Sequence, residues 1–361
     1  MLFATTFAWS ALGTLVGADE NVFVVYQFHE VGGKKVGREI SPRQIYTLRR
    51  LSLQIIFRMK ILITGASGLI GSHLTVFLID RGHDVAHLGR KKMHEGKVRH
   101  FNWDLEKEVM DVEACQWADA IIHLAGANVS EKRWTEKRKK EIIDSRVKGA
   151  QLLARNFRDQ KTIPKVIVSA SGVGYYGMET IERIFSETDP PSKDFFGECC
   201  SKWETSIDLF EEIGMRTVKL RIGVVLAKEG GALPKLAGPV KWMIGSPLAS
   251  GKQWMPWIHI DDVCELFLRA IEDDNMHGVY NAIASQQITN KQFVKTIGKV
   301  LHRPVFFPRI PKFVLKMMLG EMSGIVTEGS RVSNEKLLKT GFAFKHVELE
   351  NAMKDLLEKK R

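Results

Sequence analysis

Tyrosine and cysteine are scarce in this chain, and long hydrophobic runs are missing from most of it. The 361 residues include five tyrosines and four cysteines. The cysteines show no metal-binding spacing, so we expect no metal site, reduced thiols and a cytoplasmic location. Outside the extreme N-terminus, no run of about 18 uncharged apolar residues occurs, which argues against a membrane-spanning helix.

Acidic residues are outnumbered by basic ones, and the formal net charge is +11. Such a balance is compatible with nucleic acid or acidic lipid as a partner. The basic residues are dispersed, however, and an anionic cofactor accounts for part of the charge equally well. We therefore expect a small-molecule substrate, with neither nucleic acid nor a membrane as a partner.

Residues 1–58 do not share the pattern of the rest of the chain. An apolar, small-residue stretch occupies residues 3–17, but no positively charged segment precedes it as a secretory signal would require. Met59 stands directly before the first clear strand. We interpret residues 1–58 as an extension that is disordered or the product of a mis-called start; a targeting segment is the alternative.

From Met59 onward, predicted strands and helices alternate, which is typical of α/β proteins with a Rossmann-type doubly wound parallel sheet. The loop-rich stretch 227–258 is longer than an ordinary connection, and such loops tend to be functional. We assign residues 59–301 to a dinucleotide-binding domain and residues 302–361 to a small C-terminal cap lobe. The predicted strands are 60–64, 84–88, 120–124, 165–170, 216–222 and 278–281, and the predicted helices are 69–81, 136–158, 197–213, 261–273 and 290–301.

The most informative motif is a glycine turn between the first strand and the first helix. Gly65 allows a sharp turn off the strand, Gly68 lets a phosphate approach the backbone, and Gly71 lets the helix pack closely on the sheet. The turn directly follows an apolar strand and opens an apolar helix, which is the context that such a motif requires. The sequence therefore predicts a dinucleotide site.

The ends of the next two strands indicate which dinucleotide is bound. Gly89-Arg90 ends the second strand, where an acidic residue would bind a ribose 2′-hydroxyl and an arginine accommodates a 2′-phosphate. We therefore expect NADP rather than NAD; a solvated basic turn is the alternative. Leu124-Ala125-Gly126 ends the third strand and would line the adenosine and ribose, although a buried strand would show the same letters.

Several blocks together resemble an extended short-chain dehydrogenase/reductase. They are closer still to its atypical subgroup of epimerase family proteins, whose C-terminal domain is of unknown function. The resemblance covers essentially all of residues 59–361. The blocks are Gly65-x-x-Gly68-x-x-Gly71, His123-Leu-Ala-Gly126, Ser169-Ala-Ser-Gly-Val-Gly-Tyr-Tyr-Gly177, Lys202-Trp-Glu204, Arg221-Ile-Gly-Val-Val-Leu226 and Trp257-Ile-His-Ile-Asp-Asp-Val263.

This resemblance implies a set of cofactor contacts. The glycine turn would hold the pyrophosphate, with backbone N–H groups at its helical end as donors. Glu141 and Arg146, on the helix after the third strand, would also reach the cofactor, although pairing of charges on a solvated face is the alternative. The implied cofactor-binding residues are Gly65, Ser67, Gly68, Leu69, Ile70, Gly71, Gly89, Arg90, Leu124, Ala125, Gly126, Glu141, Arg146 and, at the nicotinamide end, Val225.

The expected catalytic residues depart from the pattern of the wider family. That family uses a Tyr-x-x-x-Lys pair, in which the lysine holds the nicotinamide ribose and lowers the pKa of the tyrosine. Lys202 is present here, but Glu198 stands four residues before it, and no tyrosine occurs in residues 177–279. A carboxylate is a poor proton acceptor for an alcohol unless it is strongly desolvated.

Other hydroxyl groups lie near the end of the fourth strand. Ser171 is our choice for a hydrogen bond to a substrate oxygen, and Tyr176 is a phenol that would shape the pocket. The predicted catalytic set is therefore Lys202, Ser171, Tyr176 and Glu198. Satisfaction of a strand-end backbone group is an equally good interpretation of Ser171.

The aromatic segment that contains Trp254 and Trp257 suits either a pocket wall or the core. We expect Asp261 and Asp262 to cap a helix, and His259 to be structural. Two functions fit the whole sequence. One is an NADP-dependent oxidoreductase or epimerase-like enzyme for a small polar or sugar-like substrate, and the other is a non-catalytic NADP(H) sensor or partner-binding protein. By analogy, a homodimer through helices 136–158 and 197–213 is possible.

Overall fold

The computed structural model describes residues 26–31, 34–39, 58–90, 98–178 and 182–358. The chain divides into two compact units, Met1–Phe57 and Arg58–Arg361. In the first unit, strands β1 (Tyr26–Val31) and β2 (Lys34–Glu39) pair antiparallel, with Tyr26 opposite Glu39. The rest of residues 1–57 lies outside the described residues, and the interpretation of this segment stays a prediction.

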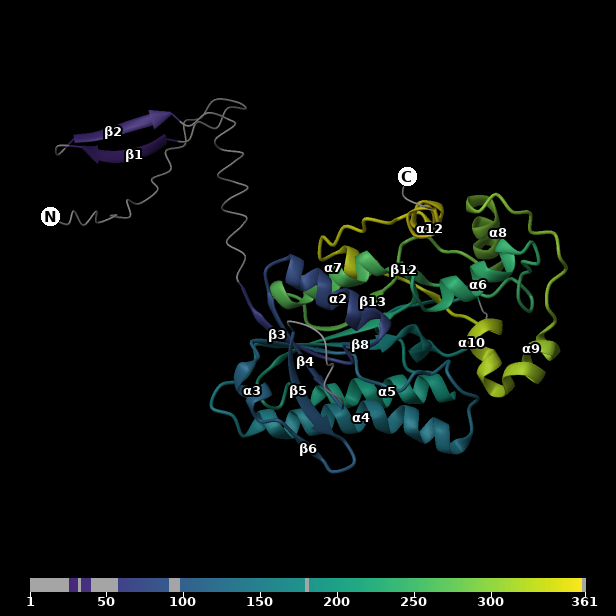
Figure 1. Cartoon of the computed structure of the whole chain (residues 1–361), viewed down its shortest axis with the longest axis horizontal. Helices are drawn as coiled ribbons and strands as arrows, with labels where there is room; N and C mark the ends of the chain where they lie inside the picture. Colours follow the sequence, from purple (N-terminus) through teal and green to yellow (C-terminus); the bar gives the residue numbers. More distant parts are fainter. Residues whose placement is uncertain (1–25, 32–33, 40–57, 91–97, 179–181, 359–361) are drawn as a thin grey trace. The chain divides into compact units, whose positions relative to one another are not determined.

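The second unit is built on an eight-stranded sheet in the order β13-β10-β8-β7-β3-β4-β5-β6, and its strands are parallel except for β6 (Figure 1). This order, in which the chain starts in the middle and winds outward to both sides, confirms the predicted doubly wound fold. The strands are β3 (Lys60–Thr64), β4 (Asp84–Gly89), β5 (Arg99–Asp104), β6 (Val109–Met110), β7 (Ala120–His123), β8 (Val166–Gly172), β10 (Arg216–Ile222) and β13 (Gly278–Ala282).

Strands β5 and β6 are absent from the sequence-based assignment. In β5, Phe101 and Trp103 are buried while the intervening Asn102 is exposed. This alternation is the pattern of a strand near the edge of a sheet, with one face in the core and one in water. Arg99 and His100 before the aromatic residues, and Asn102 between them, break the continuous apolar run that marks the central strands.

Helices cover both faces of the sheet (Figure 1). On one face α4 packs against α5, and on the other α2 packs against α7. None of the helices formed by the described residues is long and apolar enough to cross a membrane. The helices of this domain are α2 (Leu69–Asp80), α3 (Glu113–Trp117), α4 (Glu136–Arg158), α5 (Phe195–Asp208) and α7 (Ile260–Glu272), with a 3-10 turn, η1, at Val173–Tyr176.

Short polar side chains fix where two of the long helices start. The Thr135 side chain accepts a hydrogen bond from the Arg138 amide at the start of α4, and Asp194 accepts one from the Gly197 amide at the start of α5. Such caps satisfy amides that have no partner within the helix. The sequence placed the start of α5 two residues too late, because the two phenylalanines of the first turn look like loop aromatics.

The expectation that Asp261 and Asp262 cap α7 is wrong. The N-cap is His259, whose Nδ1 accepts a hydrogen bond from the Asp261 amide at 3.1 Å. The Asp262 carboxylate instead accepts hydrogen bonds from the backbone amides of Lys345 at 2.7 Å and His346 at 3.1 Å. Asp262 is 1% exposed and therefore anchors the C-terminal part of the chain inside the molecule.

The C-terminal lobe is assembled from segments that are far apart in sequence. Its apolar cluster draws on α6 (Ala232–Lys241), α8 (Asn290–Val300) and α12 (Leu349–Leu357), together with the fully buried Trp257. The stretch 227–258, predicted as loop, thus contains a helix despite Pro239 inside it. The remaining elements are β9 (Ile184–Phe185), β11 (Val224–Leu226), β12 (Trp257–His259), α9 (Lys312–Leu319), η2 (Gly320–Ser323), α10 (Gly324–Thr327), β14 (Arg331–Val332) and α11 (Glu335–Leu338).

Asp262→Ala tests the anchoring of the C-terminal segment. Two backbone amides would lose a charged acceptor, so we expect the free energy of unfolding to fall by about 3 kcal/mol. Asp274→Ala is the control, since that side chain is 91% exposed and should cost less than about 0.5 kcal/mol. Denaturant unfolding followed by circular dichroism measures both, and equal effects would contradict the anchoring role.

Candidate functional site

The glycine turn between β3 and α2 is packed so closely that two of its positions admit no side chain. Gly65 adopts φ 70°, and its carbonyl accepts a hydrogen bond from the Gly68 amide at 3.0 Å. A Cβ at Gly71 would lie 2.5 Å from the Gly65 oxygen and 2.6 Å from the Ala66 Cα. The turn is therefore tight for steric reasons, as the sequence predicted.

The N-terminus of α2 is left open by this turn. Gly68 is the N-cap in an extended conformation, and no side chain of the described residues caps the helix there. Ser67 and Gly68 are exposed, and Leu69 and Ile70 are half-buried. The first amides of a helix have no intrahelical acceptor and carry the positive end of the helix dipole, so they form a site for an anion such as a pyrophosphate.

The end of β7 is fixed against this turn. The Thr64 hydroxyl oxygen accepts hydrogen bonds from the amides of Leu124 and Ala125, both at 3.2 Å, and is hydrogen-bonded to Nδ1 of His123 at 2.9 Å. A Cβ at Gly65 would lie only 2.7 Å from the Leu124 carbonyl carbon. Burial lowers the pKa of His123 to about 4, so this imidazole is neutral near pH 7. The predicted adenosine-lining residues thus meet the glycine turn.

The segment after β11 also contacts the turn. A Cβ at Gly231 would lie 3.0 Å from the Leu69 side chain and 3.3 Å from the Val225 carbonyl oxygen. Nε2 of His73 on α2 lies 3.4 Å from the Glu229 carboxylate. Only Gly231 therefore separates Val225, predicted at the nicotinamide end, from Leu69 at the start of α2, although the two are far apart in sequence.

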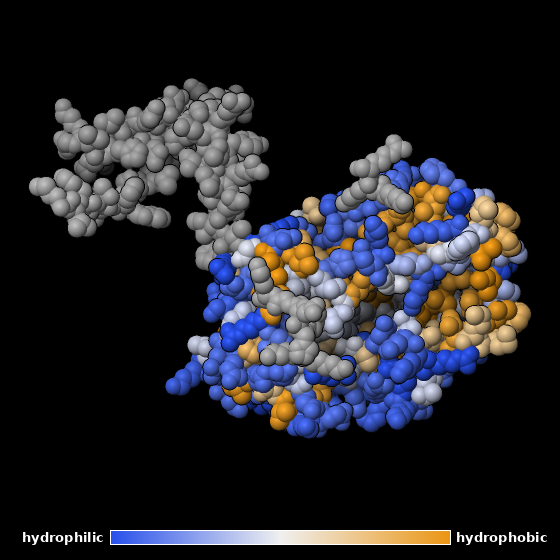
Figure 2. Space-filling view, viewed as in Figure 1, coloured by the Kyte–Doolittle hydropathy of each residue, from blue (hydrophilic) through white to orange (hydrophobic). Residues whose placement is uncertain are grey.

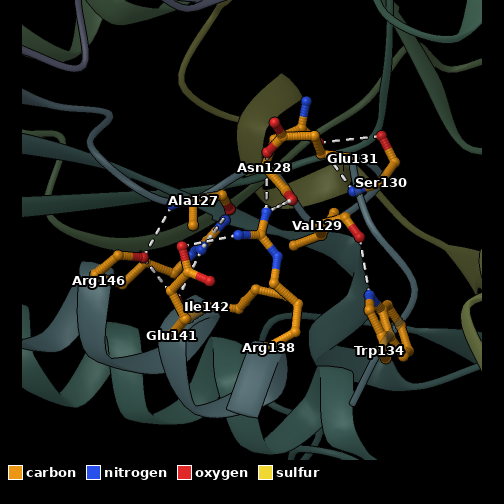
Figure 3. A network of polar contacts seen from close by, with 11 residues as sticks. Ala127, Asn128, Val129, Ser130, Glu131, Trp134, Arg138, Glu141, Ile142 and Arg146 are labelled. Carbon is orange, nitrogen blue, oxygen red and sulfur yellow. Dashed lines mark hydrogen bonds and ion pairs between the residues drawn. The ribbon is translucent and has the colours of Figure 1, made fainter. Parts of the chain in front are cut away.

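The loop that follows β7 is held by arginines of α4 (Figure 3). Arg146 donates to the carbonyl oxygens of Ala127 at 3.0 Å and Ile142 at 2.9 Å, and Arg138 donates to Asn128 at 2.7 Å. The hydrogen bond and charge of Arg138 lower the pKa of Glu141, and the two side chains form an ion pair at 2.8 Å. These contacts order the loop.

Both implied cofactor residues of α4, Glu141 and Arg146, thus have structural partners. The Arg146 guanidinium lies under Gly126, where a Cβ would approach it to 2.8 Å, and stacks at 4.8 Å from the centre of the Trp203 ring. Glu141 is exposed and forms an ion pair with Arg138. Direct contact of Glu141 and Arg146 with the cofactor stays a prediction. The ion pair of Glu141 with Arg138 fits the alternative of charge pairing on a helix face, whereas the contact of Arg146 with the loop is a role that the sequence did not indicate.

At the end of β4, Gly89 is half-buried and Arg90 is exposed, as a 2′-phosphate contact would require. After the hydrogen bond and charge of Arg138, the positive charge of Arg90 also helps to lower the pKa of Glu141. The following residues, 91–97, lie outside the described residues.

A buried ionic network lies beneath the ends of β8, β10 and β13. Arg221 donates from Nε and Nη2 to the two oxygens of Glu204, both at 2.8 Å, and from Nη1 to the Tyr176 hydroxyl at 2.9 Å. Strand register explains the grouping, since Arg221 of β10 is level with Ser171 of β8 and Asn281 of β13. Although burial alone would lower the pKa of Arg221, the hydrogen bonds and charge of Glu204 raise it.

The network takes up two of the predicted catalytic residues. The Ser171 hydroxyl donates to Glu204 at 2.7 Å, and the Tyr176 hydroxyl donates to the Asn281 side-chain oxygen at 2.7 Å. Burial raises the pKa of Tyr176 to about 12. A phenolate base needs the opposite shift, which disfavours that role for Tyr176. The prediction that Tyr176 shapes the pocket as a member of the catalytic set stays a prediction. The sequence analysis did not predict a role for Glu204 or Arg221, although a charged residue inside the apolar strand β10 was the available signal for Arg221.

Lys202 and Glu198, the other two predicted catalytic residues, face each other one turn apart on α5. The Lys202 ammonium donates to the Glu198 carboxylate at 2.6 Å, and both side chains are about half exposed. This pair is separate from the buried network, because Glu204 lies on the buried side of the same helix. Lys202 is thus accessible to a ligand that displaces Glu198.

A pocket of about 490 Å³ opens at the N-terminus of α8. The Arg331 guanidinium stacks 4.7 Å from the centre of the Trp254 ring, and Lys291 and Lys295 add positive charge. Trp254 therefore lines a pocket, one of the alternatives for this segment, whereas Trp257 belongs to the core. The remaining lining residues are Gln287, Thr289 and Gln292.

His259, His346 and Asp355 form the one group among the described residues whose potential ligand atoms lie close enough to suggest a metal, all within 4.8 Å. Nδ1 of His259, however, accepts a hydrogen bond from a backbone amide. In the neutral ring Nε2 then carries the proton and has no lone pair for a metal, and it faces Asp355 at 3.6 Å. The group suits an electrostatic contact between the start of α7 and α12.

Glu204→Ala tests whether the buried network is needed for folding. Its loss would leave the Arg221 guanidinium unpaired in the interior, and we expect a cost of about 3–5 kcal/mol. Glu198→Ala on the same helix breaks only a half-exposed pair and should cost less than about 1 kcal/mol. Denaturant unfolding measures both, Glu204→Gln gives an intermediate variant if Glu204→Ala does not fold, and a similar small cost at both positions would refute the argument.

Comparison with known proteins agrees with this geometry. Residues 61–282 match the model of the NAD dependent epimerase/dehydratase family, and residues 310–356 match Domain of unknown function (DUF1731). The chain is 36% identical over 302 residues to Epimerase family protein YfhF of Bacillus subtilis, covering 83% of this chain and 98% of that protein. It is 35% identical over 303 residues to human Epimerase family protein SDR39U1, covering 83% of this chain and 100% of that protein.

Solved structures give the same result. The crystal structure of human SDR39U1 (isoform 2) with NADPH superposes with a TM-score of 0.74 at 33% identity, over 84% of this chain and 100% of that chain. A nucleoside-diphosphate sugar epimerase from Corynebacterium glutamicum superposes with a TM-score of 0.68 at 25% identity, over 92% of this chain and 70% of that chain. The chain therefore belongs to the NAD dependent epimerase/dehydratase family, within the group named epimerase family proteins.

Proposed function

We propose that this protein is an NADP-dependent oxidoreductase or epimerase-like enzyme that acts on a small polar or sugar-like substrate. The observation that carries the proposal is the uncapped N-terminus of α2, approached by a turn too tight for any side chain at Gly65 and Gly71. The human relative that covers the same length of chain was solved with NADPH. NAD accompanies more distant structures of the same fold, so the choice of NADP rests on Arg90.

In this proposal the dinucleotide lies across the carboxyl ends of β3, β4 and β7. The amides of Leu69 and Ile70 donate to the pyrophosphate, and Arg90 binds the 2′-phosphate, for which a planar guanidinium is well suited. Leu124 and Ala125 line the adenosine side, and Val225 lies at the nicotinamide end. When bound, the nicotinamide supplies hydride transfer.

Lys202 would hold the nicotinamide ribose. Its ammonium pairs with Glu198 at 2.6 Å on the accessible side of α5, so a ribose hydroxyl can compete for the same donor. Glu198 is the carboxylate paired with Lys202 and is the candidate proton acceptor, a role that requires the bound ligands to shield this half-exposed pair from water. Ser171 and Tyr176 would support the site through their hydrogen bonds to Glu204 and Asn281.

The pocket beside Trp254 is the candidate place for the rest of the substrate. Arg331, Lys291 and Lys295 give it three cations, and Gln287, Thr289 and Gln292 add neutral polar groups. The Ser330 hydroxyl, next to Arg331, donates at 3.0 Å to the carbonyl oxygen of Gly177, directly after η1. This bond holds the residue before Arg331 against the end of η1, and the lining of the pocket favours a polar substrate.

The second candidate function is that of a non-catalytic NADP(H)-binding protein. Two observations favour it: the tyrosine of the Tyr-x-x-x-Lys pair is absent, and the phenol of Tyr176 is buried with a raised pKa. Cofactor binding would be the same in both cases. Only a measurement of turnover separates them.

Location and assembly complete the proposal. All four cysteines lie in the described part of the chain, where they are buried and unbridged, and burial raises the pKa of Cys200 to about 12. Unreactive thiols of this kind suit a reducing compartment, and we propose the cytoplasm. A homodimer through α4 and α5 remains part of the proposal, since the two helices pack side by side on one face of the sheet (Figure 1).

Turnover with NADPH and a panel of carbonyl and sugar-like compounds tests the enzyme proposal, followed by absorbance of the reduced nicotinamide. We expect activity with at least one compound and its loss by about 100-fold or more in Lys202→Met, which removes the ribose donor. Lys148→Met, which removes a half-exposed paired lysine of α4, should keep full activity. Tight NADPH binding without turnover would instead support the sensor.

Arg90→Asp tests the choice of cofactor. The substitution removes the partner of the 2′-phosphate and introduces an acceptor for a 2′-hydroxyl. We expect calorimetry to show NADPH binding weakened by about 100-fold, with NADH affected by less than about threefold. Equal losses for both nucleotides would show that Arg90 does not contact the 2′-phosphate.

A further inference from the structure

Exposed apolar side chains gather in three short segments of the C-terminal lobe. Of the fifteen large hydrophobic residues exposed in the described part of the chain, eight come from these segments, including every exposed aromatic and methionine. Trp242 is 81% exposed, and Phe313 and Met317 are each 71% exposed. The eight are Trp242, Met243, Ile244, Phe306, Phe307, Phe313, Met317 and Met318.

The three segments are neighbours in space. The Ile310 amide donates to the Pro247 carbonyl at 3.0 Å, and the Ala249 amide donates to the Ile310 carbonyl at 2.9 Å, which holds the segment before α9 beside the one after α6. The α9 helix starts directly afterward, at Lys312. Figure 2 shows a broad apolar region over the part of the molecule where Figure 1 places α6, α8 and α9. We call these eight residues, together with the exposed cations Lys241, Arg309 and Lys316 of the same segments, the apolar-basic face.

The charge of this lobe has one sign over long stretches. Residues 230–260 contain three lysines and no acidic residue, and residues 275–320 contain seven lysines and arginines and no acidic residue. Of these ten cations, only Lys299 and Lys312 take part in ion pairs among the described residues. Although basic residues are dispersed along the whole sequence, positive charge is therefore in excess in these two stretches of the C-terminal lobe.

Cations and apolar side chains alternate within the three segments. Lys241 precedes Trp242, Arg309 follows Phe307 after one residue, and Lys316 precedes Met317. A flexible lysine can keep its ammonium at a polar surface while its stem lies along apolar groups. Apolar side chains that enter the acyl boundary, ringed by cations at headgroup level, are the combination by which proteins bind membrane surfaces.

The charge also decides between possible occupants. A second copy of the chain would bring one basic face against another, which costs electrostatic energy. Nucleic acid would meet the charge and could stack on the four aromatic rings, but the aliphatic half of the face, Met243, Ile244, Met317 and Met318, has no ring for a base, whereas all eight side chains can enter an acyl layer. We propose that the apolar-basic face docks on the surface of an anionic lipid bilayer without crossing it. This differs from the sequence-based expectation of no membrane partner.

Vesicle co-sedimentation of the full chain tests the proposal, using phosphatidylcholine alone and phosphatidylcholine with roughly one-third phosphatidylglycerol. We expect binding to the anionic vesicles that weakens as salt is added, with little binding to the neutral ones. The double variants Phe313→Ser/Met317→Ser and Lys241→Glu/Lys316→Glu should each weaken partitioning by about tenfold or more.

Matched changes elsewhere serve as controls. Val112→Ser and Lys161→Glu alter an exposed apolar residue and an exposed cation outside the face, and both should bind as the parent does. Thermal unfolding and NADPH binding show whether each variant is folded. Absence of binding to anionic vesicles at low salt, or equal binding by all variants, would overturn the proposal. So would a dimer in light scattering that Phe313→Ser/Met317→Ser dissociates, or binding of an RNA oligonucleotide that the same variants lose in place of vesicle binding.

Discussion

The close approach of main chain to main chain at the β3–α2 turn is the constraint on which the rest of the site depends. With no Cβ at Gly65 or Gly71, the turn lies against the end of β7 on one side and against its own preceding backbone on the other. The position of Leu124 and Ala125 follows from the contact at Gly65, and the close start of α2 follows from the contact at Gly71. One methyl group would separate these elements and remove the anion site with them.

Buried charge forms a second layer of support. Arg221 and Glu204 connect β10 with α5, and through Tyr176, Ser171 and Asn281 they reach η1, β8 and β13. Arg146 and Arg138 likewise hold the loop after β7 by donating to its carbonyl oxygens. Desolvating these guanidinium groups is costly, and they persist only because each has several acceptors. The same bonds that stabilise the strand ends also keep two hydroxyl groups away from solvent.

The sequence predicts those parts of the fold and site whose signals are local. The glycine turn is readable because strand, turn and helix occupy one short segment, and the central strands are readable because burial on both faces makes them continuously apolar. Strand β5 is missed because only every second residue of it is apolar and buried, so the strand has no continuous apolar run. The Arg221 network depends on the register between β8, β10 and β13, which no local pattern encodes. Asp262 is misread for a similar reason, since its partners lie more than 80 residues further along the chain.

The contact at Asp262 also limits how the C-terminal lobe can move relative to the sheet and its helices. Its carboxylate is held by backbone amides at 345 and 346, and the lobe that follows shares its apolar cluster with α6 and α8. Moving α12 away from α7 would pull the two amides from the Asp262 carboxylate and leave a buried anion without hydrogen-bond donors. The lobe is therefore neither a hinged cover nor a separable module. Segment 303–311 contributes only Val305 to that cluster, so moving it would cost less burial than moving α12.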